Sequence, residues 1–372
     1  MSVNVKEMPK LGFGLMRLPV KDDEIDMQEL CRMVDAYMDA GFNYFDTAYV
    51  YHGGKSEVAA REAIVKRYPR ESFKLATKLP AWMMKEDGDR DKIFAEQLER
   101  AGVDYFDFYL LHSLELEHLP TYEKYDCFNW GKQMKAEGKI KHFGFSYHGT
   151  PELLIEILDK HPEIEFVQIQ LNYADWKNPV VRSEEVYNIL AERNIPVIVM
   201  EPVKGGTLAS LKPELEDMFR KIRPEASMAS WALRYCASLP GVVTTLSGMT
   251  HDDQMQDNLN TFSNFEPLTD EESRTVAEVS RIMLDIPQIG CTACKYCTDG
   301  CPMNISIPDV FRAVNNIRLY GDSGRPHSFY NTVVMTHGRA SECIGCGQCE
   351  GVCPQHLPII DLLKEAAEIL DK

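Results

Sequence analysis

The sequence predicts an α/β protein: a (β/α)8 barrel of the TIM type, followed by a smaller, mainly helical domain that binds metal. Two observations support this prediction. Apolar, β-rich segments alternate with amphipathic helical segments over about residues 1–262, and eight such repeats favour a barrel over an open, doubly wound sheet. Eight of the eleven cysteines then fall in two clusters near the C-terminus.

The expected strands are short, and helical segments separate them. We expect strands at 11–16, 42–46, 73–78, 106–112, 142–146, 166–172, 196–201 and 242–247. We expect the clearest helices at 27–40, 56–68, 91–101, 123–137, 151–160, 183–193 and 225–238. Apolar strands separated by amphipathic helices are typical of a parallel sheet. No GxGxxG motif follows the first strand, which counts against a dinucleotide-binding Rossmann domain.

The alternating pattern ends after Phe265. Thr269 and Glu272 form a capping-box signature, which opens a helix to about Asp285, and Pro287 then stops that helix. We therefore expect a barrel at 1–265, a linker helix at 266–286 and a cysteine domain with a C-terminal helix at 287–372.

Composition limits the classes of partner. The chain has 40 Lys and Arg against 57 Asp and Glu, a formal net charge of −17, which argues against binding to nucleic acid or to an anionic membrane. The first ten residues contain no apolar signal core, and no apolar run approaches the roughly 20 residues that span a bilayer. Clustered cysteines in such a chain indicate metal rather than disulfides. We expect a cytoplasmic protein.

Four polar residues occur where strands two to four end. Asp46, Lys78 and His112 stand at or just beyond the ends of these strands, and Tyr51 follows in the loop after Asp46. Because neighbouring parallel strands lie about 4.8 Å apart, we expect the four side chains to share one pocket. Each residue alone is more often structural, as a helix cap, a wall residue, a solvated lysine or a core histidine. Their joint occurrence at three successive strand ends predicts a catalytic site.

These residue types suit the reduction of a carbonyl by hydride. A phenol is a weak acid with an ordinary pKa of about 10, and the ammonium of Lys78 would strengthen Tyr51 as a proton donor. Asp46 would hold Lys78 charged, and His112 would polarise or orient the substrate oxygen. Tyr51 would be the general acid of the reduction and the general base of the reverse oxidation. Candidates for an apolar substrate wall, for which a core role is at least as common, are Trp82, Met83 and Met84.

These residues resemble the Asp-Tyr-Lys-His tetrad of the aldo/keto reductases, and the resemblance covers about residues 8–262. It implies an NAD(P)H-dependent reductase of aldehydes or ketones, with the nicotinamide across the barrel mouth. It also implies that Ser146 and Gln168 hold the carboxamide. The phosphate-binding region implied by the resemblance comprises Gly205, Gly206, Ser247, Gly248 and Met249. Further cofactor contacts are expected at Met200, Gln254 and Asn258.

Two departures from the family pattern bear on the cofactor. The family usually stacks an aromatic ring on the nicotinamide from the end of strand seven, where this chain has Met200, and methionine can also pack on an aromatic ring. The NADPH users of the family carry a cation after strand eight, but residues 247–258 contain three Asp and no Lys or Arg. Because a dianionic 2′-phosphate gains most from arginine, the sequence favours NADH over NADPH.

The two cysteine clusters repeat one motif, CxxCxxCxxxCP, at 291–302 and at 343–354. This is the bacterial ferredoxin spacing for [4Fe–4S] clusters, in which each fourth cysteine ligates the other cluster. We assign one cluster to Cys291, Cys294, Cys297 and Cys353, and the other to Cys343, Cys346, Cys349 and Cys301. Structural zinc is the alternative, although zinc sites usually use paired CxxC units. The simplest role for the remaining three is that of small core residues: Cys31, Cys127 and Cys236.

The cysteine domain resembles the two-cluster ferredoxins. Together with the barrel, it resembles the iron–sulfur subgroup of the aldo/keto reductases. Between Cys301 and Cys343 lie 41 residues, 302–342, which include an expected helix at 308–319. This insert is too long for a minimal ferredoxin hairpin and resembles that of a helical two-cluster ferredoxin.

The sequence therefore predicts a carbonyl oxidoreductase with an attached electron relay. Hydride carries two electrons and each cluster moves one, so a flavin normally bridges them. In one version NAD(P)H reduces the substrate, and the clusters serve a partner or the structure. In another version a ferredoxin-like partner feeds the clusters, which reduce a bound flavin or the substrate itself. The alternative from another class is a non-catalytic, nicotinamide-sensing redox or interaction module, which would not need the acid Tyr51.

Overall fold

The computed structural model describes residues 5, 8–179, 181–291, 293, 295–298, 300–322, 324–353 and 355–372. The chain divides into two compact units. The barrel unit consists of Met1–Gly205 and Glu225–Ala277, and the cysteine unit of Gly206–Pro224 and Glu278–Lys372. The limits 1–265, 266–286 and 287–372 remain a prediction from the sequence.

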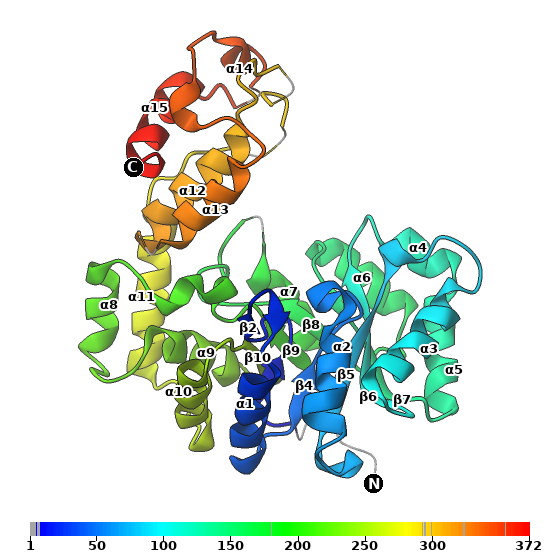
Figure 1. Cartoon of the computed structure of the whole chain (residues 1–372). Coiled ribbons are helices and arrows are strands. Elements are labelled where there is room, and N and C mark those ends of the chain that lie inside the picture. The colour runs from blue at the N-terminus through cyan, green and yellow to red at the C-terminus, as the bar shows by residue number, and fades with distance from the viewer. Residues whose placement is uncertain are drawn as a thin grey trace. The chain divides into compact units, whose positions relative to one another are not determined.

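The barrel unit contains the closed barrel of eight parallel strands that the sequence predicts (Figure 1). In ring order the strands are β1 (Leu11–Gly14), β10 (Val242–Gly248), β9 (Val197–Met200), β8 (Phe166–Gln170), β7 (Ile140–Tyr147), β6 (Phe106–Leu114), β5 (Lys74–Pro80) and β4 (Tyr44–Asp46). Because β1 pairs in parallel with both β10 and β4, the ring has no free edge. A separate two-stranded sheet joins β2 (Val20–Lys21) to β3 (Glu24–Ile25).

Helices surround the ring of strands (Figure 1). They are α1 (Met27–Asp39), α2 (Ser56–Ala60), α3 (Asp89–Ala101), α4 (Leu119–Lys124), α5 (Cys127–Ala136), α6 (Pro151–Lys160), α7 (Ser183–Glu192), α9 (Met228–Ser238) and α10 (Asp252–Ser263). Their starts follow local chemistry. Asp26 caps α1 by accepting hydrogen bonds from two backbone N–H groups, and Thr150 caps α6 immediately before Pro151. The expected linker helix is α11 (Asp270–Asp285).

Two expected helices differ in detail from the structure. The helix expected at 123–137 is two helices, α4 and α5, because Asp126 has a φ of 50°, which a right-handed helix cannot contain. The helix expected at 56–68 is α2 followed by a π-helical turn, Arg61–Val65. The sequence did not single out α8 (Pro213–Arg220), α10, α13 (Arg325–Val333) or the β2–β3 sheet.

Side chains from the strands fill the inside of the barrel. This interior cluster includes Tyr44, Ala76, Phe108, Phe166 and Ile198. Gly12 faces the same space, where a side chain would start 2.7 Å from Leu246. A larger apolar cluster lies between the strands and the helices. Cys127 and Cys236 are buried and Cys31 is half-buried.

The cysteine unit is mainly helical, as the sequence predicts. Its helices are α8, α12 (Ile307–Tyr320), α13, α14 (Gln348–Gly351) and α15 (Ile359–Leu370), together with the last part of α11. α12 packs against α13 and α15 (Figure 1), and Val310, Phe311 and Leu363 are buried between them. No helix in the described part of the chain combines the length and the apolar character that a membrane span requires.

Candidate active site and candidate cluster sites

Lys78 lies at the centre of the predicted tetrad. Its side chain is 1% exposed. Its Nζ donates hydrogen bonds to Oδ1 of Asp46 at 2.6 Å, to the carbonyl oxygen of Thr47 at 2.8 Å and to the hydroxyl of Tyr51 at 3.3 Å. One buried cation therefore joins the carboxylate to the phenol.

Strand register and one tight turn bring these groups together. Asp46 ends β4 opposite Ala76 of β5, so Lys78 lies two residues further along the neighbouring strand. Tyr51 follows in the next loop, which turns sharply at His52 and Gly53, both with a positive φ. The backbone N–H of Leu18 donates to Nε2 of His52 at 3.2 Å and holds this turn against the barrel.

His112 completes the group from β6. Its ring centroid lies 5.8 Å from that of Tyr51, nearly perpendicular to it, and 5.1 Å from that of Trp82. Its carbonyl oxygen accepts a hydrogen bond from the Tyr122 hydroxyl at 2.6 Å, which fixes the strand at this point. The structure therefore brings all four predicted residues together, and Trp82, 42% exposed, forms a wall beside them.

Burial and the nearby charges determine the protonation states. Burial alone would lower the pKa of Lys78, but the Asp46 carboxylate and the Tyr51 hydroxyl raise it above its ordinary value. Burial also raises the pKa of Tyr51, although the Lys78 ammonium opposes this. Burial, together with the same ammonium, lowers the pKa of His112 well below its usual range. At neutral pH the site therefore holds a charged lysine, a protonated phenol and a neutral imidazole.

The two residues expected to hold the carboxamide are buried opposite each other on β7 and β8. Ser146 pairs in register with Gln168. Nε2 of Gln168 donates to Oδ2 of Asp46 at 3.2 Å, and Oγ of Ser146 accepts from the backbone N–H of Ser113 at 2.8 Å. Gln168 thus belongs to the same hydrogen-bond network as the tetrad. Met200 ends β9 and packs, partly buried, against the barrel interior.

The segment after β10 is held by the residues expected to contact the cofactor. Nδ2 of Asn258 donates to Oγ of Ser247 at 2.8 Å, and Oε1 of Gln254 accepts from the backbone N–H of Thr250 at 2.8 Å. Met249 is fully buried beside them. These bonds fix the start of α10 against the end of β10.

Arg17 is an exposed cation that the sequence did not single out. A side chain at Gly205 would start 3.1 Å from Nη2 of Arg17, and a side chain at Gly248 would start 3.2 Å from its Cδ. The guanidinium therefore lies beside two of the glycines assigned to phosphate binding, whereas Gly206 belongs to the cysteine unit. Arg17 could have been found from the sequence, because it follows β1 and all eight barrel strands end on the same rim.

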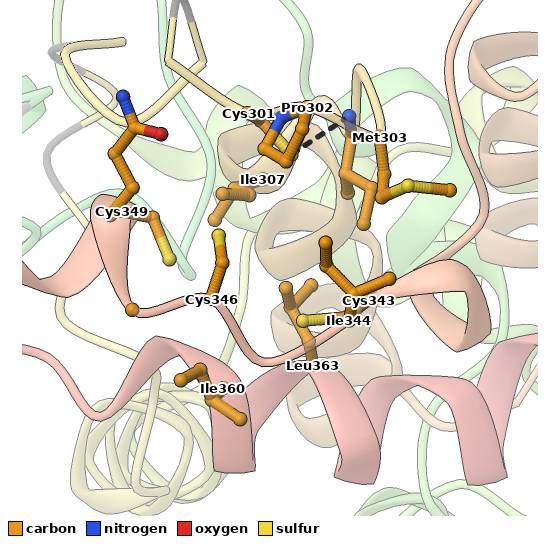
Figure 2. A pocket seen from close by; sticks show the side chains of 13 residues that line it. Cys301, Pro302, Met303, Ile307, Cys343, Ile344, Cys346, Cys349, Ile360 and Leu363 are labelled. Atoms are coloured by element: carbon orange, nitrogen blue, oxygen red, sulfur yellow. Dashed lines mark hydrogen bonds between the residues drawn. The ribbon is translucent and has the colours of Figure 1, made fainter.

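Four cysteines from the two motifs line one cavity in the cysteine unit (Figure 2). They are Cys301, Cys343, Cys346 and Cys349. Ile360 and Leu363 of α15 form part of the apolar wall. The cavity thus unites the fourth cysteine of the first motif with the first three of the second, the combination expected for cross-ligation.

A second cavity is lined by Cys291, Cys297 and Cys353, and the fourth expected ligand, Cys294, lies outside the described residues. Ile307 lines both cavities, so the start of α12 lies between them. Soft thiol donors in apolar surroundings suit iron–sulfur clusters. Among the described residues, no three Cys, His, Asp or Glu side chains converge to hold a single metal ion.

Comparison with protein families assigns both parts of the chain. Residues 10–281 match the model of the aldo/keto reductase family. Residues 290–357 match that of the 4Fe-4S dicluster domain.

Curated relatives agree with the match to the barrel. The uncharacterized oxidoreductase YqkF of Bacillus subtilis is 25% identical over 300 residues, which cover 73% of this chain and 92% of the relative. An NADH-specific methylglyoxal reductase of Escherichia coli is 26% identical over 299 residues, which cover 68% and 89%. Probable aldo-keto reductase 1 of Glycine max is 27% identical over 209 residues, and the match spans 57% of that protein.

Solved structures show the same fold. An aldo-keto reductase from Bacillus halodurans in its holo form has a TM-score of 0.59 at 26% identity, covering 72% of this chain and 91% of the other. An aldo-keto reductase from Klebsiella pneumoniae, in complex with NADPH, has a TM-score of 0.58 at 21% identity, covering 73% and 91%. The chain is thus an oxidoreductase of the aldo/keto reductase family, with a 4Fe–4S ferredoxin domain following its barrel.

Proposed function

We propose that this oxidoreductase reduces an aldehyde or ketone to the alcohol with NAD(P)H, and that it also catalyses the reverse oxidation. The strongest support is the buried Lys78 ammonium, which hydrogen-bonds both Asp46 and Tyr51. A phenol held against a fixed cation is a proton donor whose conjugate base is already stabilised.

Each residue of the tetrad has one part in the reaction. Bound NAD(P)H supplies the hydride, which adds to the carbonyl carbon. Tyr51 donates its hydroxyl proton to the carbonyl oxygen, so the product is a neutral alcohol, and Tyr51 regains a proton from solvent before the next turnover. Lys78, kept charged by Asp46, stabilises the phenolate. The neutral His112 donates one ring N–H toward the substrate oxygen and orients it.

The cofactor would lie along the rim that carries these residues. Ser146 and Gln168 would hold the carboxamide, and Met200 would pack on the nicotinamide ring. Arg17 would pair with the phosphates beside Gly205 and Gly248, where the missing side chains leave room. The remaining contacts would come from Ser247, Met249, Gln254 and Asn258, whereas a contact from Gly206 stays a prediction from the sequence alone.

We further propose that NADH is preferred over NADPH. Residues 247–258 carry no cation for a 2′-phosphate, and a relative at 26% identity is named as NADH-specific. Calorimetry with each cofactor tests this preference. NADPH binding as tight as that of NADH, or tighter, would remove it.

In the cysteine unit, we propose two [4Fe–4S] clusters. One would be held by Cys301, Cys343, Cys346 and Cys349, which line one cavity. The other would be held by Cys291, Cys294, Cys297 and Cys353, of which the three described residues line the second cavity. The clusters would pass single electrons to or from a ferredoxin-like partner. Clusters ligated by free thiolates suit a reducing compartment, so we place the protein in the cytoplasm.

Tyr51→Phe tests the assignment of the acid. It should reduce NADH-dependent turnover on a panel of aldehydes and ketones by at least about a hundredfold, because the proton donor is lost, while cofactor affinity stays within about twofold. Tyr105→Phe is the matched control, because Tyr105 immediately precedes β6, at the opposite end of the barrel. Equal turnover in the two variants would refute the role of Tyr51.

In one alternative, the clusters proposed for the two cavities feed electrons to the substrate through a flavin bound at the barrel mouth. In that case turnover would depend on a reduced ferredoxin rather than on NADH. A non-catalytic nicotinamide sensor would instead bind cofactor tightly and show no turnover with either donor.

A further inference from the structure

Glu57 is a buried carboxylate close to the tetrad, and it has no part in the reaction proposed above. It is the second residue of α2 and is fully buried. Burying a carboxylate is costly unless it is hydrogen-bonded. Oε1 of Glu57 accepts hydrogen bonds from Oγ1 of Thr77 at 2.6 Å and from Nε2 of Gln97 at 3.1 Å.

These bonds tie Glu57 to the backbone of Lys78. Thr77 directly precedes Lys78 on β5, and Nε2 of Gln97 also donates to the carbonyl oxygen of Lys78 at 3.0 Å. The amide of Gln97 is in turn fixed by the Tyr109 hydroxyl, which donates to Oε1 of Gln97 at 2.6 Å. The carboxylate therefore holds the strand segment from which the Lys78 ammonium projects.

The other oxygen of Glu57 faces the loop that carries Tyr51. Oε2 lies 3.8 Å from Nη1 of Arg100 and has no hydrogen-bond partner within the described part of the chain. Nη1 of Arg100 donates to the carbonyl oxygen of Tyr49 at 3.4 Å, and the guanidinium lies 4.1 Å from the Tyr49 ring centroid. Because Tyr49 is two residues before Tyr51, Glu57 and Arg100 also brace the loop that presents the acid.

The charged and titratable groups facing Glu57 come from three elements: Arg100 of α3, Lys78 of β5 and Tyr109 of β6. Burial raises the pKa of Glu57 to about 7, against the opposing effects of its hydrogen bonds and of the two cations. The carboxyl group would therefore change its charge near neutral pH.

We propose that Glu57 is a positioning residue for proton transfer: it aligns the Lys78 ammonium with the Tyr51 hydroxyl. This inference rests on the proposed carbonyl reduction. This role is more than structural. Glu57 contacts both the strand segment that carries Lys78 and the Arg100 side chain that holds the Tyr51 loop, so its loss would change the alignment of the acid as well as the stability of the fold.

The test is Glu57→Gln, which keeps the shape of the side chain and removes its charge. In the full chain, kcat should fall about tenfold while KM for NADH changes less than about twofold, because misalignment of the acid slows the proton-transfer step rather than binding. The wild-type pH profile of kcat should show a break near the pKa of Glu57, about 7, that the variant lacks. Glu62→Gln is the control, since Glu62 lies on the following turn and pairs with Lys66 near the surface.

The outcomes separate this inference from the proposed function. Unchanged kcat and an unchanged pH profile in Glu57→Gln, next to an active wild type, would overturn the positioning role. If the wild type has no turnover on any carbonyl, the proposed function fails, and crystal structures decide the inference. The separation of Lys78 Nζ from the Tyr51 hydroxyl, 3.3 Å here, should lengthen in Glu57→Gln and not in Glu62→Gln, and equal separations would contradict it.

Two further variants serve if Glu57→Gln does not fold. Thr77→Val removes the bond on the Lys78 side and Arg100→Gln weakens the brace on the Tyr51 side, and neither replaces the buried carboxylate. Both should lower kcat and move the pH profile. Two variants with wild-type profiles would refute the role of Glu57.

Discussion

At the scale of single residues, the site depends on a lysine that is charged and almost completely buried. An ammonium in such a place needs a compensating anion and hydrogen-bond acceptors. Lys78 has the Asp46 carboxylate, the Thr47 carbonyl oxygen and the Tyr51 hydroxyl. The proposed chemistry and the stability of this region therefore both depend on the ion pair of Lys78 with Asp46.

Asp46→Asn should impair both the stability and the turnover. The variant leaves the ammonium buried without its anion, so we expect the free energy of unfolding to fall by roughly 3 kcal/mol and turnover to be lost. Denaturant unfolding measures the first effect. Asp35→Asn is the control, because the pair of Asp35 with Arg67 is partly exposed and should contribute less than about 1 kcal/mol. If the free energy of unfolding falls equally in the two variants, Asp46 does not stabilise a buried charge.

Glu57 should make stability depend on pH. Its pKa is about 7 when folded, against an ordinary value of 4.5, so the folded state binds the proton more tightly than the unfolded state. The stabilisation from this proton is complete below pH 4.5 and is lost as pH rises through 7. Relative to Glu57→Gln, the wild type should lose about 3 kcal/mol across this window. If the free energy of unfolding depends on pH in the same way in the wild type and in Glu57→Gln, this prediction is wrong.

How far single residues could be placed from the sequence depends on where the signal lies. Asp46, Lys78 and His112 could be found because strand ends are visible as the limits of apolar runs. Arg17 follows the end of β1 in the same way, although its nearness to Gly205 and Gly248 is visible only in the fold. Glu57 could not be found, because its partners on α3 and β5 are brought to it only by the packing of the barrel.

At the scale of elements, the strands were predictable and the helix breaks were not. A strand covered on both faces is almost continuously apolar, and all eight such runs form strands. At the break between α4 and α5, Asp126 adopts the left-handed conformation. Because no Gly or Pro marks this position, the sequence gives no sign of the break. The start of α10 carries no clear sequence signal, because its N-cap residue, His251, makes no side-chain capping hydrogen bond.

The barrel interior gives a test at this scale. In Gly12→Ala the new carbon would lie 2.7 Å from Leu246 and 2.8 Å from Thr244, whereas in Gly14→Ala the nearest atom is 3.5 Å away. We expect Gly12→Ala to lower the free energy of unfolding by about 1–3 kcal/mol through overpacking, and Gly14→Ala to change it less. Calorimetric unfolding measures the free energy of unfolding of both variants. If Gly12→Ala is as stable as the wild type, the barrel interior is not closely packed around Gly12.

At the scale of the whole molecule, the fold class followed from two patterns, and the division into units did not. Strand–helix alternation predicted the barrel, and the repeated cysteine motif predicted a second domain. The segment Gly206–Pro224 lies within the barrel part of the sequence yet belongs to the cysteine unit. That assignment depends on contacts distant in sequence, which no local pattern carries.

The proposed nicotinamide and the proposed clusters both carry electrons, and the two proposals differ in which of them reduces the substrate. In the proposed reaction, hydride would pass directly from the nicotinamide to the carbonyl carbon, and Tyr51 would supply the proton. Transfer through a flavin or through the clusters would convert hydride to electrons and solvent-exchangeable protons. The two routes therefore differ in the fate of the transferred hydrogen.

The most direct measurement is an anaerobic turnover with NADH deuterated at both C4 positions, followed by mass spectrometry of the alcohol. We expect one deuterium on the carbinol carbon of nearly every product molecule formed by the wild type and by Tyr105→Phe, and at least about a hundredfold less product from Tyr51→Phe. Product that carries solvent hydrogen at that carbon, or no turnover at all in the wild type, would contradict it.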